Sequence, residues 1–168
     1  SRVADCARAV HAGRITRSTG KPFDTVVQIG IGGSHLGPRA MYLALRNYVA
    51  AQGEGPALEA QFVSNVDPDD AGDVIDRIDP ETTLFILVSK SGTTQETLTN
   101  EAFVVEKMRE HDIRGLNPRR HMVAVTSETS PLARSGEYLD AFFIDDYIGG
   151  RYSSTSAVGG CVLSLAFG

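Results

Sequence analysis

Short, mainly apolar runs alternate along the chain with segments in which apolar residues recur every three or four positions. The first pattern predicts buried strands, and the second predicts amphipathic helices. Strands are expected at residues 25–29, 60–64, 84–88, 121–125 and 141–144. Because apolar strands that alternate with helices are typical of a parallel sheet covered on both faces, the pattern predicts an α/β protein. We expect a three-layer α/β/α sandwich around a five-stranded parallel sheet in the flavodoxin-like order 2-1-3-4-5.

Helices are expected at the start of the chain and between the strands. In the first dozen residues one apolar stripe is formed by Val3, Ala7 and Val10. A second helix is expected to begin near Gly37 and Pro38, because proline suits the first helical turn. Its buried face is expected to consist of Met41, Leu45, Tyr48 and Val49.

A hydroxyl-rich turn follows the third expected strand. It consists of Ser89, Lys90, Ser91, Gly92, Thr93 and Thr94. A helix is expected to start here, so that its free N–H groups and the positive end of its dipole point at the turn. Hydroxyl groups donate to phosphate oxygens, and a glycine lets the backbone approach closely. The turn therefore predicts a phosphate site.

The same residues also fit a simple helix cap. Thr93 as N-cap and Glu96 three residues later would form a capping box. The two interpretations are compatible, because a cap satisfies one or two N–H groups and leaves others for a ligand. Capping alone does not account for Ser89, Lys90 and Ser91 just upstream.

A glycine-rich turn, residues 30–35, follows the first expected strand. Ligands of open parallel sheets bind beyond the carboxyl ends of the strands where the winding direction reverses, and strands one and three are neighbours there. We therefore expect Gly33 and Ser34 to face residues 89–94 and to enclose one phosphate with them. Nucleotide binding is the alternative, but His35 stands where a dinucleotide fingerprint has its third glycine.

A third candidate segment, residues 145–153, follows the fifth expected strand. Gly149 and Gly150 free the backbone, so that Arg151 can direct a fixed positive charge into a pocket. The alternative is that Arg151 pairs with one of the two aspartates that begin the segment. Strand five lies two strands from strand three, about 10 Å away at normal strand spacing. Arg151 therefore reaches the phosphate site only if the loop folds back over the sheet.

Composition narrows the function classes. The 168 residues carry a net charge of −5 and no run of lysine or arginine, which argues against nucleic-acid binding. The apolar runs are too short to span a bilayer, so no membrane contact is expected. Cys6 and Cys161 lack metal or redox spacing, so no metal site and a reduced, cytoplasmic compartment are expected. The chain starts without methionine and stops within an apolar segment, and we expect a piece of a longer protein.

Three segments together give the chain a resemblance to a known family, namely residues 30–38, residues 89–96 and residues 149–153 with Ser156. In this order they resemble the first sugar-isomerase (SIS) domain of the glucose-6-phosphate isomerase family, over essentially the whole chain. The middle segment fits many SIS proteins, whereas the last is far more specific. We expect residues 1–22 to form a helix and connector, and residues 23–168 to form a phosphosugar-binding SIS domain truncated at its C-terminal end.

The resemblance implies a role for each candidate residue. The sugar phosphate would be held by Gly33, Ser34, Ser89, Lys90, Ser91, Gly92, Thr93 and Thr94. Arg151 would be the catalytic residue that stabilises negative charge on the reacting sugar, and Glu96 and Gly150 would orient it. His35 departs from the aspartate that many relatives have, and we expect it to be a tolerated variant.

The resemblance also implies a reaction without metal or cofactor. The family interconverts glucose 6-phosphate and fructose 6-phosphate by ring opening and proton transfer through an enediol. Its base glutamate, ring-opening histidine and a further lysine would lie beyond Gly168, so this chain alone is expected to bind sugar phosphate weakly and to be inactive. A homodimer is expected for the full-length enzyme, and exposed apolar surface is expected at residues 158–167. The alternative function is a non-catalytic SIS module that senses a sugar phosphate.

Overall fold

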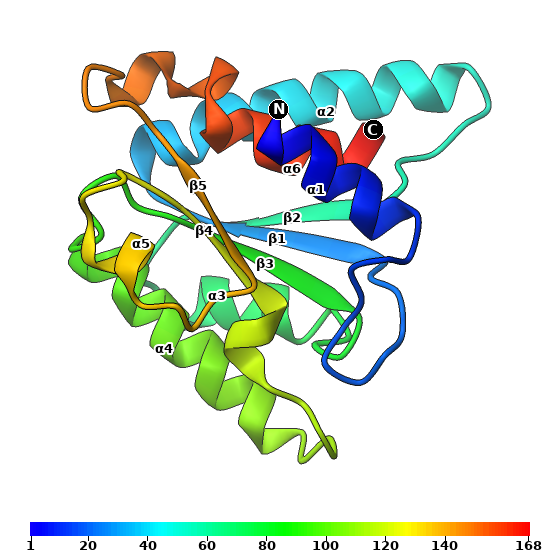
Figure 1. Ribbon diagram of the computed structural model, residues 1–168. Coiled ribbons are helices and arrows are strands. Elements are labelled where there is room, and N and C mark those ends of the chain that lie inside the picture. Colours follow the sequence, from blue (N-terminus) through cyan, green and yellow to red (C-terminus); the bar gives the residue numbers. More distant parts are fainter.

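A parallel sheet organises the chain, and the computed structural model describes residues 1–168 except the side chain of Pro68. The strand order is β2-β1-β3-β4-β5, and all neighbouring strands are parallel (Figure 1). The strands are β1 (Thr25–Ile29), β2 (Glu59–Val63), β3 (Thr83–Val88), β4 (Met122–Thr126) and β5 (Asp140–Phe143). The predicted fold class and strand order are confirmed, and each strand boundary lies within one residue of the prediction.

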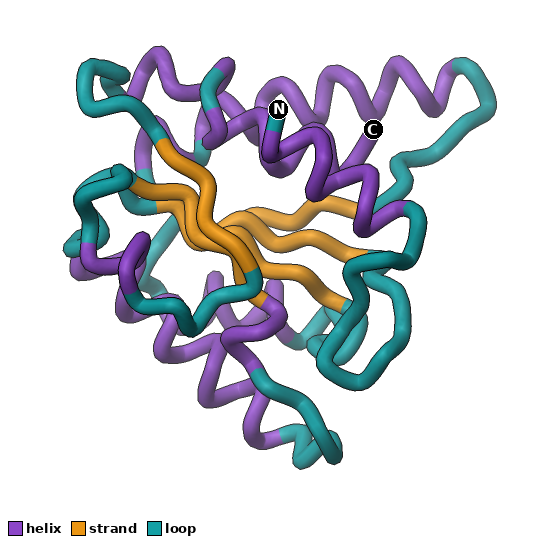
Figure 2. Tube along the Cα trace, in the orientation of Figure 1, coloured by secondary structure: helices purple, strands orange, loops and turns teal.

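Helices cover both faces of the sheet, which gives the predicted three-layer sandwich (Figures 1 and 2). One layer contains α1 (Arg2–His11), α2 (Leu36–Ala51) and α6 (Ala157–Phe167). The opposite layer contains α3 (Pro68–Ile75), α4 (Gln95–Glu110) and α5 (Pro131–Arg134). Short 3₁₀ helices are η1 (Gly32–Ser34), η2 (Pro118–His121) and η3 (Gly150–Thr155). Because both faces are covered, the central strands must be apolar on both sides.

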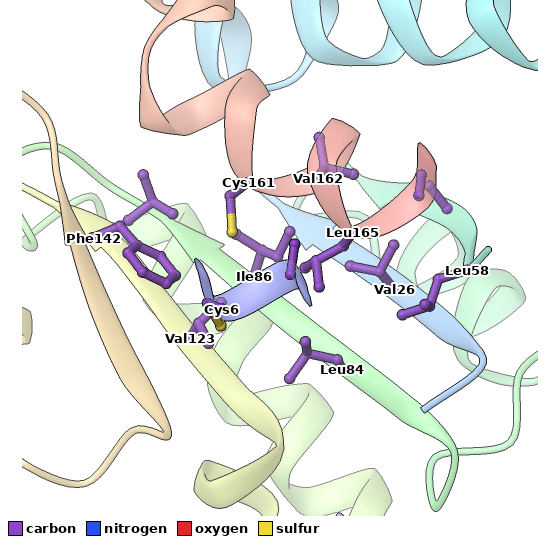
Figure 3. Packing of buried hydrophobic residues seen from close by; sticks show 14 of the residues in the cluster. Cys6, Val26, Leu58, Leu84, Ile86, Val123, Phe142, Cys161, Val162 and Leu165 are labelled. Carbon is purple, nitrogen blue, oxygen red and sulfur yellow. The ribbon is translucent and has the colours of Figure 1, made fainter. Parts of the chain in front are cut away.

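β3 lies at the centre of the core. Its six residues are all buried, and their side chains alternate between the two faces. Leu84 and Ile86 pack in one cluster with residues of α1 and α6. Phe85 and Leu87 pack in the other cluster with residues of α3 and α4. Figure 3 shows the first cluster, in which α6 lies over the sheet. Such a strand gives the turn that follows it a fixed starting point.

α6 is buried, which corrects one expectation. The sequence predicts exposed apolar surface over residues 158–167, and this prediction is wrong. The buried residues are Val158, Gly159, Cys161, Val162, Leu165 and Ala166. The helix packs against α1, α2 and the sheet, and therefore needs apolar residues on every side. A Cβ atom on Gly159 would lie 1.9 Å from the carbonyl oxygen of Ser154, so glycine is required for this close packing.

α2 shows the opposite discrepancy. Its buried residues are Pro38 and Tyr42, and Val49 is half-buried. Large apolar residues on its surface are Leu36, Met41, Leu43, Leu45 and Tyr48. Tyr48 is 64% exposed, so the predicted buried face is wrong for most of its residues. The physical reason is that large apolar residues lie on the exposed side of this helix as well as on its buried side, so the apolar pattern does not identify the core side.

Substitutions in α6 and in α2 should differ in their effect on the free energy of unfolding. Leu165→Ala in α6 should lower the free energy of unfolding by about 2–5 kcal/mol, because it leaves a cavity in the core. The matched variant Leu43→Ala in α2 should change it by less than about 0.5 kcal/mol, because that side chain is already 43% exposed. Urea unfolding followed by circular dichroism measures both values. Equal losses would contradict the exposed position of α2.

Candidate functional site

The first turn at the carboxyl edge of the sheet lies tightly against the end of β3. A Cβ atom on Gly30 would lie 3.3 Å from Cβ of Val88 and 2.9 Å from the carbonyl oxygen of Ser34. The Gln28 side-chain amide donates a hydrogen bond to the same carbonyl oxygen at 2.7 Å. β1 and β3 pair along their whole length, so the two predicted ligand turns start from neighbouring strands.

Hydroxyl groups brace the second turn, which follows β3, from within. Ser89 Oγ lies 2.9 Å from Thr94 Oγ1 and accepts a hydrogen bond from the Gly92 N–H group at 3.1 Å. Ser91 Oγ accepts hydrogen bonds from the backbone N–H and the hydroxyl of Thr93, at 3.1 and 3.0 Å. A hydroxyl group has one donor and two acceptor positions, so these bonds leave the Ser91 hydrogen unused. The turn is preformed and keeps donor capacity for an anion.

α4 begins at this turn without the predicted cap. Its N-cap residue is Thr94, whose side chain makes no capping hydrogen bond. The predicted capping box between Thr93 and Glu96 is therefore wrong, because the Thr93 hydroxyl donates to Ser91 and the Thr94 hydroxyl pairs with Ser89. The first N–H groups of a helix have no acceptor within the helix. Those of α4 are thus open to solvent or to an anion.

The loop after β5 folds back over the sheet and brings Arg151 to the first turn. Gly33 and Gly150 touch backbone to backbone, since a Cβ atom on Gly33 would lie 2.3 Å from the Gly150 carbonyl oxygen. Ser153 Oγ donates a shared hydrogen bond to the carbonyl oxygens of Gly33 and Gly150, at 3.2 and 2.7 Å. In Figure 1 this orange segment lies beside the start of α2. The condition that the sequence set for Arg151 is therefore met.

Arg151 lines a cleft of about 550 Å³. The cleft is otherwise lined by Gly32, Gly33, Leu36, Gly37, Gly150 and Ser154. Arg151 is exposed and forms no ion pair with any carboxylate in the described part of the chain. Asp145 instead accepts a hydrogen bond from the Tyr147 hydroxyl at 3.0 Å, and Asp146 accepts one from the Ser127 hydroxyl at 2.8 Å. The guanidinium is thus available to an anionic ligand.

The hydroxyl-rich turn borders a separate hollow. This hollow measures about 230 Å³ and is lined by Lys90, Ser91, Ser127, Thr129, Ser130, Pro131 and Asp146. Of the residues predicted to bind phosphate, Gly33 lines the Arg151 cleft, and Lys90 and Ser91 line this hollow. Glu96 is exposed and lines neither cavity. The structure brings the turns to one edge of the sheet but does not enclose all the predicted residues in one cavity.

A larger hollow of about 790 Å³ runs along α4, away from this edge. Its buried Glu101 accepts hydrogen bonds from Arg119 at 3.3 Å and from the Tyr138 hydroxyl at 2.9 Å. Burial, followed by the charge of Glu101, raises the pKa of Tyr138 well above its usual value of 10.0. These groups satisfy one another, so we assign the network to packing between α4, η2 and β5.

The last residue of β4 and the residue after it belong to the site although sequence reasoning missed them. Thr126 Oγ1 donates to the carbonyl oxygen of Ser89 at 2.6 Å, and the Ser127 N–H group donates to that of Lys90 at 2.9 Å. These two bonds fix the backbone of the hydroxyl-rich turn to the end of β4. The signal was present in the sequence, because hydroxyl residues at 126–130 follow β4 just as they follow β3.

The Lys90 side chain extends away from the hydroxyl-rich turn. Its Nζ atom donates to the carbonyl oxygens of Asp146 at 2.7 Å and Ile148 at 3.1 Å. The ammonium group therefore contacts the loop that carries Arg151.

His35 lies behind the first turn and is buried. Its ring packs near Phe62, with 5.9 Å between ring centroids, and Nε2 has no hydrogen-bond partner among the described residues. Burial, followed by the positive charge of Arg39, lowers the pKa of His35 below its usual value of 6.5. We therefore expect a neutral ring at pH 7, which supports a packing role.

Two negative findings concern the described residues alone. They contain no cluster of three or more His, Cys, Asp or Glu side chains that could hold a metal ion. None of their helices is long and apolar enough to cross a membrane.

Comparison with known proteins decides which family the chain is part of. The family model described as phosphoglucose isomerase matches residues 1–168. The chain belongs to the phosphoglucose isomerase family. This confirms the resemblance carried by the three segments of the sequence.

Relatives within the phosphoglucose isomerase family agree with this assignment. Glucose-6-phosphate isomerase from Treponema denticola is 56% identical over 167 residues, which cover 99% of this chain and 30% of the relative. The enzyme of that name from Treponema pallidum is 58% identical with the same coverage. A crystal structure of a glucose-6-phosphate isomerase from Chlamydia trachomatis has a TM-score of 0.84 at 45% identity, and the match covers 99% of this chain and 29% of that one. The chain thus spans about 30% of the length of the curated relatives it matches.

The contact between Gly33 and Gly150 can be tested by adding one methyl group. Gly33→Ala should force η1 and η3 apart and lower the free energy of unfolding by about 1–3 kcal/mol, because backbone atoms cannot move aside cheaply. Gly72→Ala in α3 is the control, since nothing lies within 4 Å of the added atom. That control should be neutral or slightly stabilising. Unfolding curves and the amide NMR signals of residues 150–153 measure the effect, and unchanged signals in Gly33→Ala would contradict the contact.

Burial of His35 predicts a pH dependence of stability. Because its folded pKa lies below 6.5, the unfolded chain binds more protons as the pH falls below that value. The folded state therefore loses stability from pH 6.5 downward and gains nothing from this group above it. Compared with His35→Gln, the wild-type chain should lose more unfolding free energy between pH 7 and pH 5. Parallel stability curves for the two proteins would contradict a buried neutral ring.

Proposed function

We propose that the polypeptide containing this chain is a glucose-6-phosphate isomerase, and that residues 1–168 supply the phosphate-binding part of its active site. Family membership supports this proposal. The observation that carries it is the return of the loop after β5, which sets Arg151 against Gly33 at the edge where β1 and β3 end. An arginine held beside the glycine-rich turn, at the same sheet edge as the hydroxyl-rich turn, suits a substrate that has a phosphate at one end and a reacting carbonyl at the other.

The phosphate is bound, in this proposal, by the two turns together. The candidate residues are Gly33, Ser34, Ser89, Lys90, Ser91, Gly92, Thr93 and Thr94. The uncapped start of α4 and the unused Ser91 hydroxyl hydrogen supply donors, and the helix dipole favours negative charge. Local donors are needed because the chain as a whole carries a net charge of −5.

Arg151 acts on the sugar after the ring has opened. A carboxylate base removes the proton from C2 of open-chain glucose 6-phosphate, and the C1 carbonyl oxygen gains negative charge in an enediolate. A proton then passes from the C2 hydroxyl to the C1 oxygen, and the base returns its proton to C1 to give fructose 6-phosphate. A guanidinium beside that oxygen stabilises the charge and never deprotonates, so it does not compete with the base. Gly150, which precedes Arg151 and touches the backbone of Gly33, is proposed to orient it, whereas the expected orienting role of Glu96 is not retained because Glu96 forms no ion pair with Arg151 among the described residues. No cofactor is required, and the resemblance assigns the base and the ring-opening histidine to residues outside this chain.

The proposed domain is a phosphosugar-binding SIS domain at residues 23–168, preceded by a helix and connector at residues 1–22. α1 packs on the same core, since Cys6, Ala7 and Val10 are buried in the cluster that contains α6. We infer that this helix steadies the domain and takes no part in binding.

We also propose a cytoplasmic homodimer for the full-length enzyme. The exposed apolar residues of α2 support burial in a larger assembly, since exposed apolar patches commonly mark protein–protein interfaces. No contact with nucleic acid or membrane is proposed. Sedimentation of the full-length protein tests the assembly, and a monomer would overturn it.

A non-catalytic SIS module that senses a sugar phosphate is the second candidate. Such a module needs the hydroxyl turn but has no use for an arginine aimed at an enediolate. The exposed Arg151, unpaired with any described carboxylate, therefore favours the enzyme.

Arginine substitution tests the enzyme directly. In the full-length protein Arg151→Met should lower kcat about 10²–10³-fold, the usual loss for one oxyanion donor. Arg114→Met is the control, because Arg114 is exposed in the loop beyond α4. Residues 1–168 alone should shift their amide NMR signals with fructose 6-phosphate and show no turnover. Turnover by these residues alone, or full activity of Arg151→Met, would contradict the proposal.

A further inference from the structure

Lys90 belongs to the hydroxyl-rich turn, but its ammonium group is bonded elsewhere. Nζ donates to the carbonyl oxygens of Asp146 and Ile148, at 2.7 and 3.1 Å. Both carbonyls lie in the loop that leads from β5 to Arg151, on the far side of β4 from the end of β3. An ammonium group has three donors, so two of them hold this loop.

The same loop is anchored at its other end by the first turn. Gly150 touches the backbone of Gly33, and Ser153 donates to the Gly33 carbonyl oxygen at 3.2 Å. Arg151 therefore lies between the Lys90 bond to Ile148, three residues before it, and the Ser153 bond to Gly33, two residues after it. Each anchor comes from one of the two turns that we propose to bind phosphate.

β4 supports the first anchor without replacing it. The Ser127 N–H group donates to the Lys90 carbonyl oxygen at 2.9 Å, and the Ser127 hydroxyl donates to Asp146 Oδ1 at 2.8 Å. Asp146 is thus bonded through its carboxylate to Ser127, just after β4, and through its carbonyl to Lys90. Ile148, three residues before Arg151, has only the Lys90 bond to fix its carbonyl oxygen among the hydrogen bonds of the described chain.

We propose that the Lys90 side chain is a positioning residue that ties the phosphate turn to the loop carrying Arg151. The inference rests on the proposed function and refines the role of Lys90 within it. The backbone of Lys90 remains part of the phosphate turn, while its ammonium group sets the place of the guanidinium. Phosphate bound in the turn then stiffens the segment that holds Arg151. Binding energy from the non-reacting end of the substrate is thereby used at the reacting end.

Kinetics of the full-length protein separate positioning from phosphate binding. Lys90→Met removes the donors and keeps most of the aliphatic stem. We expect kcat for fructose 6-phosphate to fall about 10–100-fold, because the catalytic group is misplaced. The KM and the inhibition constant of inorganic phosphate should each change less than about threefold, since phosphate contacts remain. Lys90→Arg, which can donate to both carbonyls, should restore most of kcat.

Lys107→Met is the matched control. Lys107 is also a hydrogen-bonded lysine near the surface, with Nζ 2.8 Å from Glu110, but it lies on α4 away from both cavities. Its kinetic constants should equal those of the wild type. A general effect of losing one positive charge would appear in both variants and would overturn the specific role of Lys90.

A double substitution shows whether Lys90 acts through Arg151. In an Arg151→Met background, Lys90→Met should have little further effect, because there is no guanidinium left to position. Independent contributions would multiply instead. Multiplied losses, together with a parallel rise in KM and in the inhibition constant of phosphate, would make Lys90 a direct phosphate ligand and overturn the proposal.

NMR spectra of residues 1–168 give a readout that does not depend on turnover. The amide signals of Gly149 and Gly150 should shift in Lys90→Met, move back in Lys90→Arg and stay unchanged in Lys107→Met. Unchanged signals in a folded Lys90→Met chain would overturn the loop contact. A full-length wild-type protein without turnover would instead overturn the proposed function, while the amide signals still decide whether Lys90 holds the loop.

Discussion

The contact between two glycine backbones, Gly33 and Gly150, is the constraint on which the site depends. A Cβ atom at Gly33 would lie 2.3 Å from the Gly150 carbonyl oxygen, so no other residue fits there without movement of the backbone. This contact lets a loop that starts at β5 end beside β1. Arg151 therefore lies beside the turn after β1, although β5 is separated from β1 by two other strands.

Backbone carbonyl groups hold the rest of the edge together. The carbonyl of Ser89 accepts from Thr126, that of Lys90 from Ser127, and those of the β5 loop from Lys90 itself. Loops at the end of a parallel sheet carry many backbone groups without a strand partner, and each needs an acceptor or donor. Here the Thr126 hydroxyl, the Ser127 N–H group and the Lys90 ammonium group satisfy them. The hydroxyl-rich sequence therefore serves the protein's own backbone as well as any anion.

The sequence predicted the fold well because the signal for buried parallel strands is local. Residues 84–88 are apolar throughout since both faces of β3 are covered, and this holds in every such sheet. The predicted face of α2 was wrong because large apolar residues lie on its exposed side as well as on its buried side, so the apolar pattern does not identify the buried side. The capping box failed for another reason: Thr93 and Ser91 bond to each other, a choice that residue types leave open. The direction of Lys90 depends on carbonyls 56 and 58 residues away, which no local pattern reports.

Arg151 forms no ion pair with its acidic neighbours because these carboxylates bond to other side chains. Asp145 and Asp146 stand six and five residues before it, and either could neutralise it. Both are engaged instead, Asp145 by the Tyr147 hydroxyl and Asp146 by the Ser127 hydroxyl. A guanidinium already paired with a carboxylate would have to break that pair before it could stabilise charge on a sugar, and part of its binding energy would be lost. Because both carboxylates are bonded elsewhere, the Arg151 guanidinium is paired with no carboxylate of the described chain before a ligand binds. Electrostatic stabilisation of a developing oxyanion requires such a preorganised positive charge.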